Sequence, residues 1–409
     1  MNFLLYLISS VTSIVGSGMQ SVVIPLYILK VTGSGLEMGK AASVFLVLSL
    51  ITGPIMGIVA DKFNRKYLLI ICDFLSFITI LILLLSGRTS TSSIILMQGV
   101  LVIISRCFSS ASSAIFSELD SIKKVERNNN IYSGVITFTQ IFTPILGVAL
   151  YGFMKIELIF LLNAITFLIS GFSEFFIQYT PSEKRKEIKI QSVKSVIASY
   201  APVVKYLKEK DEILGVSGYI IVLNFFFNPV TTIVFSYFIL QELNLKPSYI
   251  GYLQSVFVIG LLLGNIIIGK FLKTIEFREK ITYFLMIQLM ILALFMNMDL
   301  YIPNPYFIYI NGFLILMLGI FNSLVNIPFL SYLQKTVDCD IKGRFFSLLD
   351  TMVRSVVPFG LIIFGLLIDY KFNIRSVVTM GSITLTIATY LFFGKTKAGK
   401  KFVNKSIAN

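Results

Sequence analysis

The sequence predicts an all-α membrane protein with twelve transmembrane helices in two related bundles of six. The 409 residues are 56% hydrophobic and only 14% charged, whereas soluble domains contain about 25% charged residues. Apolar runs of about 20 residues recur along almost the whole chain, and each is long enough to cross a bilayer as a helix. Similarities between the two halves then divide the twelve runs into two groups of six.

The spans follow one another with short polar connectors between them. The first begins close to the N-terminus, which lacks the basic region of a secretory signal and stays apolar for too long to be one. Pro305 and Pro328 bracket the tenth span. The expected spans are residues 4–29, 40–60, 67–86, 94–115, 131–153, 157–178, 213–239, 249–271, 281–298, 305–330, 345–368 and 375–394.

The distribution of cations predicts the orientation. Most of the 35 lysine and arginine residues lie in the tail and in the connectors after the even-numbered spans. The positive-inside rule therefore predicts that both termini lie in the cytoplasm. We expect a multi-pass protein of a bacterial inner membrane.

The predicted domains are residues 1–179, a linker at 180–212, residues 213–394 and a basic tail at 395–409. Val193, Val196, Ile197, Val203, Val204 and Leu207 follow a near-helical spacing in the linker, which predicts an amphipathic helix at the membrane surface. Pro144 and Pro358 are among the residues that match at an offset of 214, which indicates a duplicated bundle. Parallel repeats of this kind place a substrate site between the halves.

Composition excludes several function classes. The chain has no histidine and three widely spaced cysteines, so neither a metal site nor a disulfide framework is predicted. The sequence contains no Walker loop, so nothing in it suggests ATP hydrolysis. It also contains no visible constellation of catalytic residues that would suggest an enzyme. The net charge of +14 is spread over connectors rather than over one basic face, so we expect no nucleic-acid partner.

The connector between the second and third spans places one carboxylate among three cations. It reads GIVADKFNRKYLL and resembles the cytoplasmic motif of the major facilitator superfamily, roughly GxLaDrxGrk. Gly57, Asp61 and Arg65 match this motif, while Asn64 replaces a glycine and tolerates the same left-handed turn. With the twelve spans and the long central linker, the resemblance covers essentially the whole chain and implies the major facilitator fold.

The resemblance implies a latch between the two halves. In the family, the motif aspartate meets the start of span eleven, and the motif arginine meets an acid at the end of span four. The partners here would be segment 342–346 for Asp61, and Glu118 or Asp120 for Arg65. We expect this latch to hold the outward-open state. The alternative is that the cations only anchor the connector in the cytoplasm.

Within the superfamily the sequence resembles bacterial drug exporters of the macrolide-efflux type. Residues 53–74, 104–116 and 342–370 are the basis of this resemblance. It implies export of amphiphilic drugs by proton antiport and alternating access, with the proton gradient as energy source and no cofactor. The expected partners are the substrate and the lipid bilayer, and we expect a monomer.

Ionisable groups inside the spans are functional candidates because they are costly at membrane depth. Asp73 in span three and Arg106 in span four are predicted to pair and to couple transport to protons, since a carboxylate that gains and loses a cation can bind and release a proton. In related exporters the arginine of this helix is tied to proton coupling. A purely structural pair is the alternative.

Two further features have both a structural and a functional interpretation. Asp350 and Arg354 share a helix face, so they form either a self-neutralising pair or a pair whose arginine reaches the substrate cavity. TPILG, which contains Pro144 and Gly147, partly matches the exporter motif gxxxGPxxGG. The resemblance implies a bend that closes the inner leak path of antiporters, and an ordinary proline kink is the alternative.

The remaining polar and aromatic candidates lie in or beside the spans that line the cavity in this fold. Amides and aromatic rings suit an apolar or cationic drug. The cavity candidates are Gln20, Asn224, Phe226, Asn228, Tyr237, Gln254, Asn322, Asn326 and Arg354. The rival function is an exporter or flippase of a natural product, siderophore or lipid. A membrane sensor or a membrane enzyme lacks the domain or the site that it would need.

Overall fold

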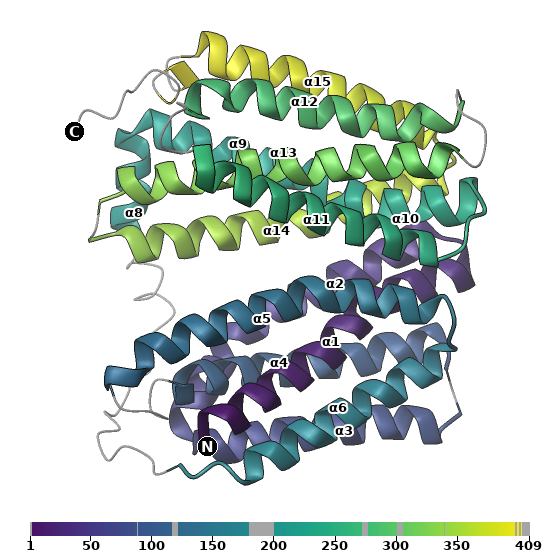
Figure 1. Ribbon diagram of the computed structural model, residues 1–409, viewed down its shortest axis with the longest axis vertical. Coiled ribbons are helices and arrows are strands. Elements are labelled where there is room, and N and C mark those ends of the chain that lie inside the picture. Colours follow the sequence, from purple (N-terminus) through teal and green to yellow (C-terminus); the bar gives the residue numbers. More distant parts are fainter. Residues whose placement is uncertain are drawn as a thin grey trace. The chain divides into compact units, whose positions relative to one another are not determined.

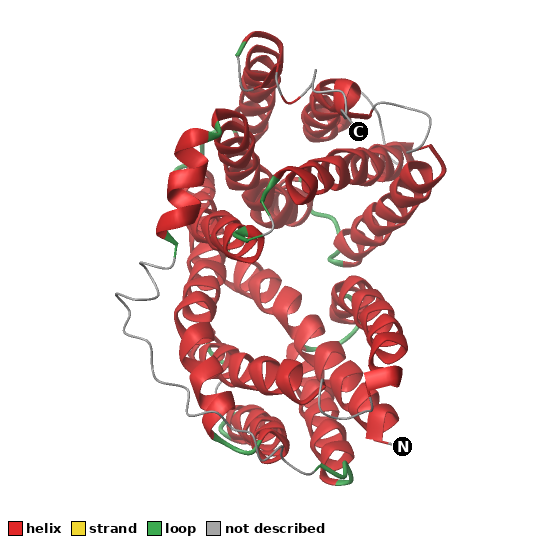
Figure 2. Ribbon diagram, turned by 90° about the vertical axis from the view of Figure 1, so that its left-hand side faces the viewer, coloured by secondary structure: helices red, strands yellow, loops and turns green. Residues whose placement is uncertain are grey.

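The computed structural model describes residues 2–87, 89–116, 122–179, 200–271, 277–300, 306–338, 340–396, 399–400 and 402. The chain divides into two compact units, each described by itself. Unit 1 is Met1–Ile190 with Ser236–Gly251, and unit 2 is Gln191–Phe235 with Tyr252–Asn409. All regular structure in the described ranges is helical (Figure 2).

Unit 1 contains six long helices, which Figure 1 shows in purple to teal. They are α1 (Asn2–Thr32), α2 (Gly35–Lys62), α3 (Arg65–Leu85), α4 (Thr91–Phe116), α5 (Ile122–Tyr151) and α6 (Ile156–Phe175).

Unit 2 begins with the short helix α8 (Ala201–Glu209) and continues with the remaining spans, which are coloured teal to yellow (Figure 1). They are α9 (Asp211–Pro229) with η1 (Val230–Val234), then α11 (Ser248–Phe271), α12 (Phe277–Asn297) with η3 (Met298–Leu300), α13 (Tyr306–Thr336), α14 (Lys342–Asp369) and α15 (Ile374–Lys395). The seventh span continues from η1 into α10 (Phe235–Tyr237) and η2 (Phe238–Glu242); residues 236–251, which include most of this continuation and the first residues of α11, are grouped with unit 1.

The prediction of twelve spans is confirmed. Among the described residues, twelve helices are long and apolar enough to cross a membrane. The seventh runs without a break from Asp211 to Glu242, although two π-helical turns interrupt its regular α-helix. Such turns occur frequently at functional sites.

The two units repeat one packing pattern. In unit 1, α3 packs against α4 and α6, and α1 packs against α5. In unit 2, α12 packs against α13 and α15, and α9 packs against α14. Figure 1 shows the pairs α3–α6 and α12–α15 side by side. These pairs occupy the same positions in the order of the six spans, so the two bundles are pseudo-symmetric.

The connector between α2 and α3 differs from the left-handed turn that asparagine would tolerate in place of glycine. Asn64 has a φ of −64° and a ψ of 117°, and its side chain accepts a hydrogen bond from the Lys66 amide at 3.0 Å. It is therefore the N-cap of α3, a position that asparagine favours because its side chain satisfies a free backbone N–H.

Part of the predicted amphipathic segment is helical. In α8, Val203 and Tyr206 are buried in the core of unit 2 beside Tyr332 and Val337, whereas Val204 is 44% exposed. Tyr206 also donates a hydrogen bond to the carbonyl of Thr336 at 3.1 Å. Burial raises the pKa of Tyr206, and the Asp338 carboxylate adds to this effect. The predicted positions at 193, 196 and 197 lie outside the described residues.

Candidate functional site

Asp73 lies inside unit 1 with its side chain buried. The residue is 1% exposed, and its two carboxylate oxygens lie 3.1 and 3.3 Å from the hydroxyl of Ser13 on α1. Arg106, on the neighbouring α4, is half-buried and has contacts of its own. No ion pair joins the described side chains of Asp73 and Arg106 in this conformation, so their pairing in another conformation stays a prediction.

A chain of serine hydroxyls leads from Asp73 to a second buried carboxyl group. Ser13 lies 2.9 Å from the hydroxyl of Ser170 on α6, and Ser170 lies 3.1 Å from the hydroxyl of Ser9 on α1. Ser9 donates in turn to Glu174 Oε1. Three helices, α1, α3 and α6, thus bring together two carboxyl groups and three hydroxyls.

Sequence reasoning missed Glu174. The residue is 0% exposed, and its Oε2 atom has no hydrogen-bond partner in the structure. The signal in the sequence is an acid inside the apolar run 157–178, close to the expected end of that span. Its burial depends on α1 and α3 covering it, which the sequence of α6 does not encode.

Gln20, a predicted cavity residue, forms hydrogen bonds to other side chains in the interior of unit 1. It is 1% exposed, donates to Gln98 Oε1 on α4 at 2.7 Å and accepts from Asn163 on α6. These amide bonds tie α1 to two other helices. Contact between Gln20 and a substrate would require this network to open.

The segment of α5 with the predicted bend packs closely against α1. The helix continues through Pro144, and a Cβ built at Gly147 would be 2.7 Å from Met19 Cα. One turn earlier on α5, Thr143 packs against Gly18 of α1. Small residues permit such contact between helix backbones. The bend's role in closing a leak path stays a prediction.

In unit 2, two predicted cavity residues, Asn224 and Asn228, precede the π-helical turns. Pro229 has no N–H to donate, so the carbonyl of Phe225 loses its partner in the helix, and Gly360 of α14 approaches that carbonyl closely. Asn224 donates to the Ile220 carbonyl at 2.9 Å. Two threonine hydroxyls donate to carbonyls further along the helix, Thr231 to Phe227 O and Thr232 to Asn228 O.

Phe226 is buried, unlike an open cavity residue. It is 8% exposed, contacts Phe227 and Phe364 edge to face, and packs against Gly381 of α15. A contact with substrate would require this cluster to rearrange, because close-packed side chains leave no free surface.

The other cavity candidates are more accessible. Asn326 is exposed and donates to the side-chain oxygen of Asn322 at 2.8 Å. Gln254 is half-buried and its Oε1 atom has no hydrogen-bond partner in the structure. Tyr237 is half-buried in the seventh span. Their role in substrate binding stays a prediction.

The predicted pair on α14 is present. Arg354 Nε lies 2.8 Å from Asp350 Oδ2, and both side chains are more than half exposed. The pair neutralises itself within one helix. An exposed pair of this kind contributes about 1 kcal/mol or less to stability.

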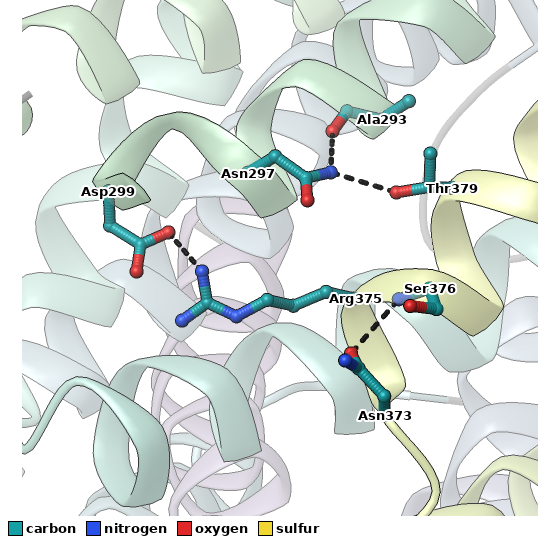
Figure 3. A network of polar contacts seen from close by, with 7 residues as sticks. All are labelled: Ala293, Asn297, Asp299, Asn373, Arg375, Ser376 and Thr379. Atoms are coloured by element: carbon teal, nitrogen blue, oxygen red, sulfur yellow. Dashed lines mark hydrogen bonds and ion pairs between the residues drawn. The ribbon is translucent and has the colours of Figure 1, made fainter. Parts of the chain in front are cut away.

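A second ion pair in unit 2 joins the start of α15 to the short helix η3. Figure 3 shows Arg375, at the start of α15, reaching Asp299 in η3. Beside it, Asn297 bridges the carbonyl of Ala293 and the hydroxyl of Thr379, both at 2.8 Å. These contacts join α12 to α15.

The latch predicted from the connector motif stays a prediction. Glu118 and Asp120 lie outside the described residues, as does the side chain of Asp61, while Arg65 and Gly57 are half-buried. Among the residues that the structure describes, no group of three or more metal-ligating side chains occurs.

Two solved transporters and a bacterial homologue of a third are similar in fold. The chain matches the nucleoside transporter NupG with a TM-score of 0.70 and 16% identity, covering 97% of this chain and all of NupG. For an inward-facing bacterial homologue of the iron transporter ferroportin, the TM-score is 0.68 at 16% identity, covering 95% and 97%. For a D-xylose-proton symporter it is 0.66 at 13% identity, covering 97% and 99%.

Two curated relatives come from Bacillus subtilis (strain 168). The uncharacterized MFS-type transporter YfiS is 23% identical over 389 residues, covering 91% of this chain and 88% of YfiS. The uncharacterized MFS-type transporter YvqJ is 22% identical over 354 residues, covering 84% and 79%. The family model of the Major Facilitator Superfamily matches residues 6–360 and 218–408. The chain is therefore a multi-pass membrane transporter, not an enzyme, and belongs to the Major Facilitator Superfamily.

Proposed function

We propose that this transporter exports amphiphilic small molecules, macrolide antibiotics among them, from the cytoplasm of a bacterium in exchange for protons. Transport proceeds by alternating access. The proton gradient is the energy source, so no cofactor is required. The protein works as a monomer in the cytoplasmic membrane, with both termini in the cytoplasm.

The observation that supports antiport most directly is the contact of Gly147 with Met19. The gap between the α1 and α5 backbones is too narrow here for even one methyl group. In the exporters that the chain resembles, this part of the fifth span closes a leak path. Direct backbone packing suits that role, because it leaves no space for water between the two helices.

The carboxyl group of Asp73 supports the use of protons. It is buried at membrane depth and is contacted by a hydroxyl rather than a cation. An uncompensated charge at such a place is costly, so a carboxyl group that exchanges a proton there can link its protonation to a change of conformation.

The chemistry of the candidate cavity supports an amphiphilic substrate. Apart from Arg354, these residues are amides and aromatic side chains, and Asp350 balances the charge of Arg354. Walls of this kind bind by apolar contact with a few hydrogen bonds. They offer no concentrated charge for an anionic nutrient.

The test is accumulation of ethidium and erythromycin in an efflux-deficient bacterial host, with and without a protonophore. Cells expressing the wild type should accumulate less of at least one probe, and both the protonophore and Arg106→Ala should abolish this difference. Lys40→Ala, which removes an exposed cation paired with Glu37, should retain it. Unchanged accumulation of both probes despite confirmed membrane expression would contradict drug export and favour a dedicated exporter of a natural product or lipid.

A further inference from the structure

The buried polar chain of unit 1 ends in a carboxyl group on each side. Asp73 on α3 is followed by Ser13 on α1, Ser170 on α6, Ser9 on α1 and Glu174 on α6. Each of the five residues is at most 5% exposed. The site lies within one unit, so its geometry does not depend on how the two units are placed.

Counting hydrogens shows what these contacts require. Four hydrogen-bond contacts join the five side chains, and the Ser170 hydroxyl also lies 3.1 Å from the carbonyl oxygen of Ser9. Three serine hydroxyls provide only three hydrogens. With both carboxyl groups ionised, at least one of the four side-chain contacts has no hydrogen to share. One additional proton on either carboxyl group completes the chain, because the hydroxyls can then all point toward the other carboxylate.

The environment gives the charge no other compensation. Among the described residues, neither Asp73 nor Glu174 forms an ion pair with lysine or arginine, and Glu174 Oε2 accepts no hydrogen bond. Two carboxylates linked by hydroxyls in a medium of low dielectric repel one another. One proton held by the two groups together relieves this repulsion and fills the fourth contact.

Unit 2 makes the corresponding helix contacts with neutral groups, although it buries a carboxylate elsewhere, that of Glu212 in the first turn of α9. There, the hydroxyl of Tyr219 on α9 bonds to Thr389 on α15, which joins the corresponding first and sixth spans of that bundle. The buried polar residue in the middle of α12, the counterpart of α3, is the neutral Gln288. The acids of unit 1 therefore add cost without being needed for the architecture, which indicates a function.

We propose that Asp73, Glu174 and the three serines form a site that binds and releases one proton during the transport cycle. In the protonated state one carboxyl group is COOH and the other COO⁻. On release the pair loses a single proton to water, both groups become COO⁻, and the bundle must open or admit water. The structure thus assigns to Glu174 a role equal to that of Asp73. The part of this inference that concerns coupling rests on the proposed function.

Other groups face this site and enter its pH dependence. Cys72 adjoins Asp73 on α3, and Cys107 lies on the neighbouring α4; both are free thiols and buried. Arg106 precedes Cys107 on α4 and is half-buried. Tyr6, on α1, is buried one turn from Ser9 and bonds to Ser112. Two interacting carboxyl groups lose their protons in two macroscopic steps, so the transition measured for the last proton belongs to the pair and not to either residue.

Infrared spectroscopy of the purified full-length protein tests the site without a transport substrate. A band from a protonated carboxyl group should disappear as the pH is raised. The double variant Asp73→Asn/Glu174→Gln should lack this band, whereas Glu157→Gln, on the first turn of the same α6, should keep it. Ser170→Ala retains both acids but interrupts the chain, so the singly protonated state loses its stabilisation and the band should disappear at a lower pH than in the wild type. Identical spectra for the wild type, Ser170→Ala and the double variant would overturn the proposal.

The occupant is tested by changing the salt at constant pH. The band should be the same in sodium and potassium chloride; its removal by sodium alone would mean that a metal cation occupies the site, which overturns the proton assignment. In transport, Glu174→Gln should lose pH-driven export of ethidium or erythromycin and keep exchange of the probe across proteoliposomes. Normal pH-driven export in this variant would refute the inference and leave the proposed function intact. A band that titrates as expected in a protein that exports neither probe would refute drug export and leave the proton site intact.

Discussion

Gly147 on α5 lies directly against the backbone of Met19 on α1. A Cβ at Gly147 would be 2.7 Å from the Met19 Cα atom and 2.8 Å from its carbonyl oxygen. Neither neighbour is a flexible side chain, so the two helices would have to move apart to accept a methyl group. The glycine therefore sets the distance between α1 and α5.

Replacing this glycine should loosen unit 1. We expect Gly147→Ala to lower the stability of the purified protein by about 1–3 kcal/mol, the usual cost of overpacking a close contact. Thermal unfolding in detergent measures this change. Gly134→Ala, in the same helix with no neighbouring atom within 4 Å of its Cβ, is the control. Equal stability of the two variants would show that α1 and α5 can separate freely.

The ion pair between Arg375 and Asp299 should stabilise unit 2 more than an exposed pair does. Their side chains are only 19% and 17% exposed, so Arg375→Gln leaves a partly buried carboxylate without its cation. We expect a loss of about 1–3 kcal/mol. Lys40→Gln, which breaks an exposed pair, should cost about 1 kcal/mol or less. If both changes have the same small effect on thermal unfolding, the pair at Arg375 is unimportant for stability.

The raised pKa of Tyr206 predicts how the stability of the folded protein changes at alkaline pH. Its pKa is raised above the ordinary value in the folded protein, chiefly by burial. Below about pH 10 the tyrosine is protonated in both the folded and the unfolded chain, so its contribution is constant. Above that pH the unfolded chain loses the proton first, and stability falls as pH rises.

Tyr206→Phe should remove this alkaline loss. At neutral pH the variant also loses the hydrogen bond to the Thr336 carbonyl, which should cost about 1 kcal/mol. Unfolding temperatures measured from neutral pH to pH 11 compare the wild type with the variant. Parallel pH profiles would contradict the assignment of this slope to Tyr206.

The proposed latch at Asp61 makes a prediction about conformation. If Asp61 holds the outward-open state, Asp61→Asn should shift the population toward the inward-open state, because the amide has no charge for the start of a helix. Labelling of a cysteine introduced on the cytoplasmic side of the cavity should then accelerate. Glu37→Gln, at the other end of α2, should leave the labelling rate unchanged. An unaltered rate in Asp61→Asn would leave anchoring of the connector as the role of these charges.

Several features of the site could be predicted from local sequence alone. Asp73 is conspicuous because it interrupts a strongly apolar span, and Asp350 and Arg354 are four residues apart on one helix. The structure confirms the pair on α14, in which Arg354 Nε lies 2.8 Å from Asp350 Oδ2. Gly147 and Pro144 were found through a short motif, but the partner of Gly147 on α1 was not, since no pattern in α5 specifies which helix approaches it.

Other features depend on contacts between distant segments. Gln20 and Phe226 are residue types that often line a cavity, yet each is buried against helices that are distant in the sequence. Glu174 is a further example: in the sequence it lies near the end of a span, where an acid is ordinarily exposed, yet in the structure it is fully buried by neighbouring helices. Burial is decided by neighbouring helices, so a single span cannot reveal it.

The sequence by itself determined that this chain crosses a membrane twelve times and repeats one six-helix bundle. The length of each apolar segment and the charge of each connector are local properties of the sequence, and these properties decide which segments insert into a bilayer and in which orientation. The sequence also determined the family through the connector after the second span. Only the tertiary structure decided that α1 brings Ser9 and Ser13 between Asp73 and Glu174, because the register and rotation of packed helices follow from the fit of side chains across the whole bundle.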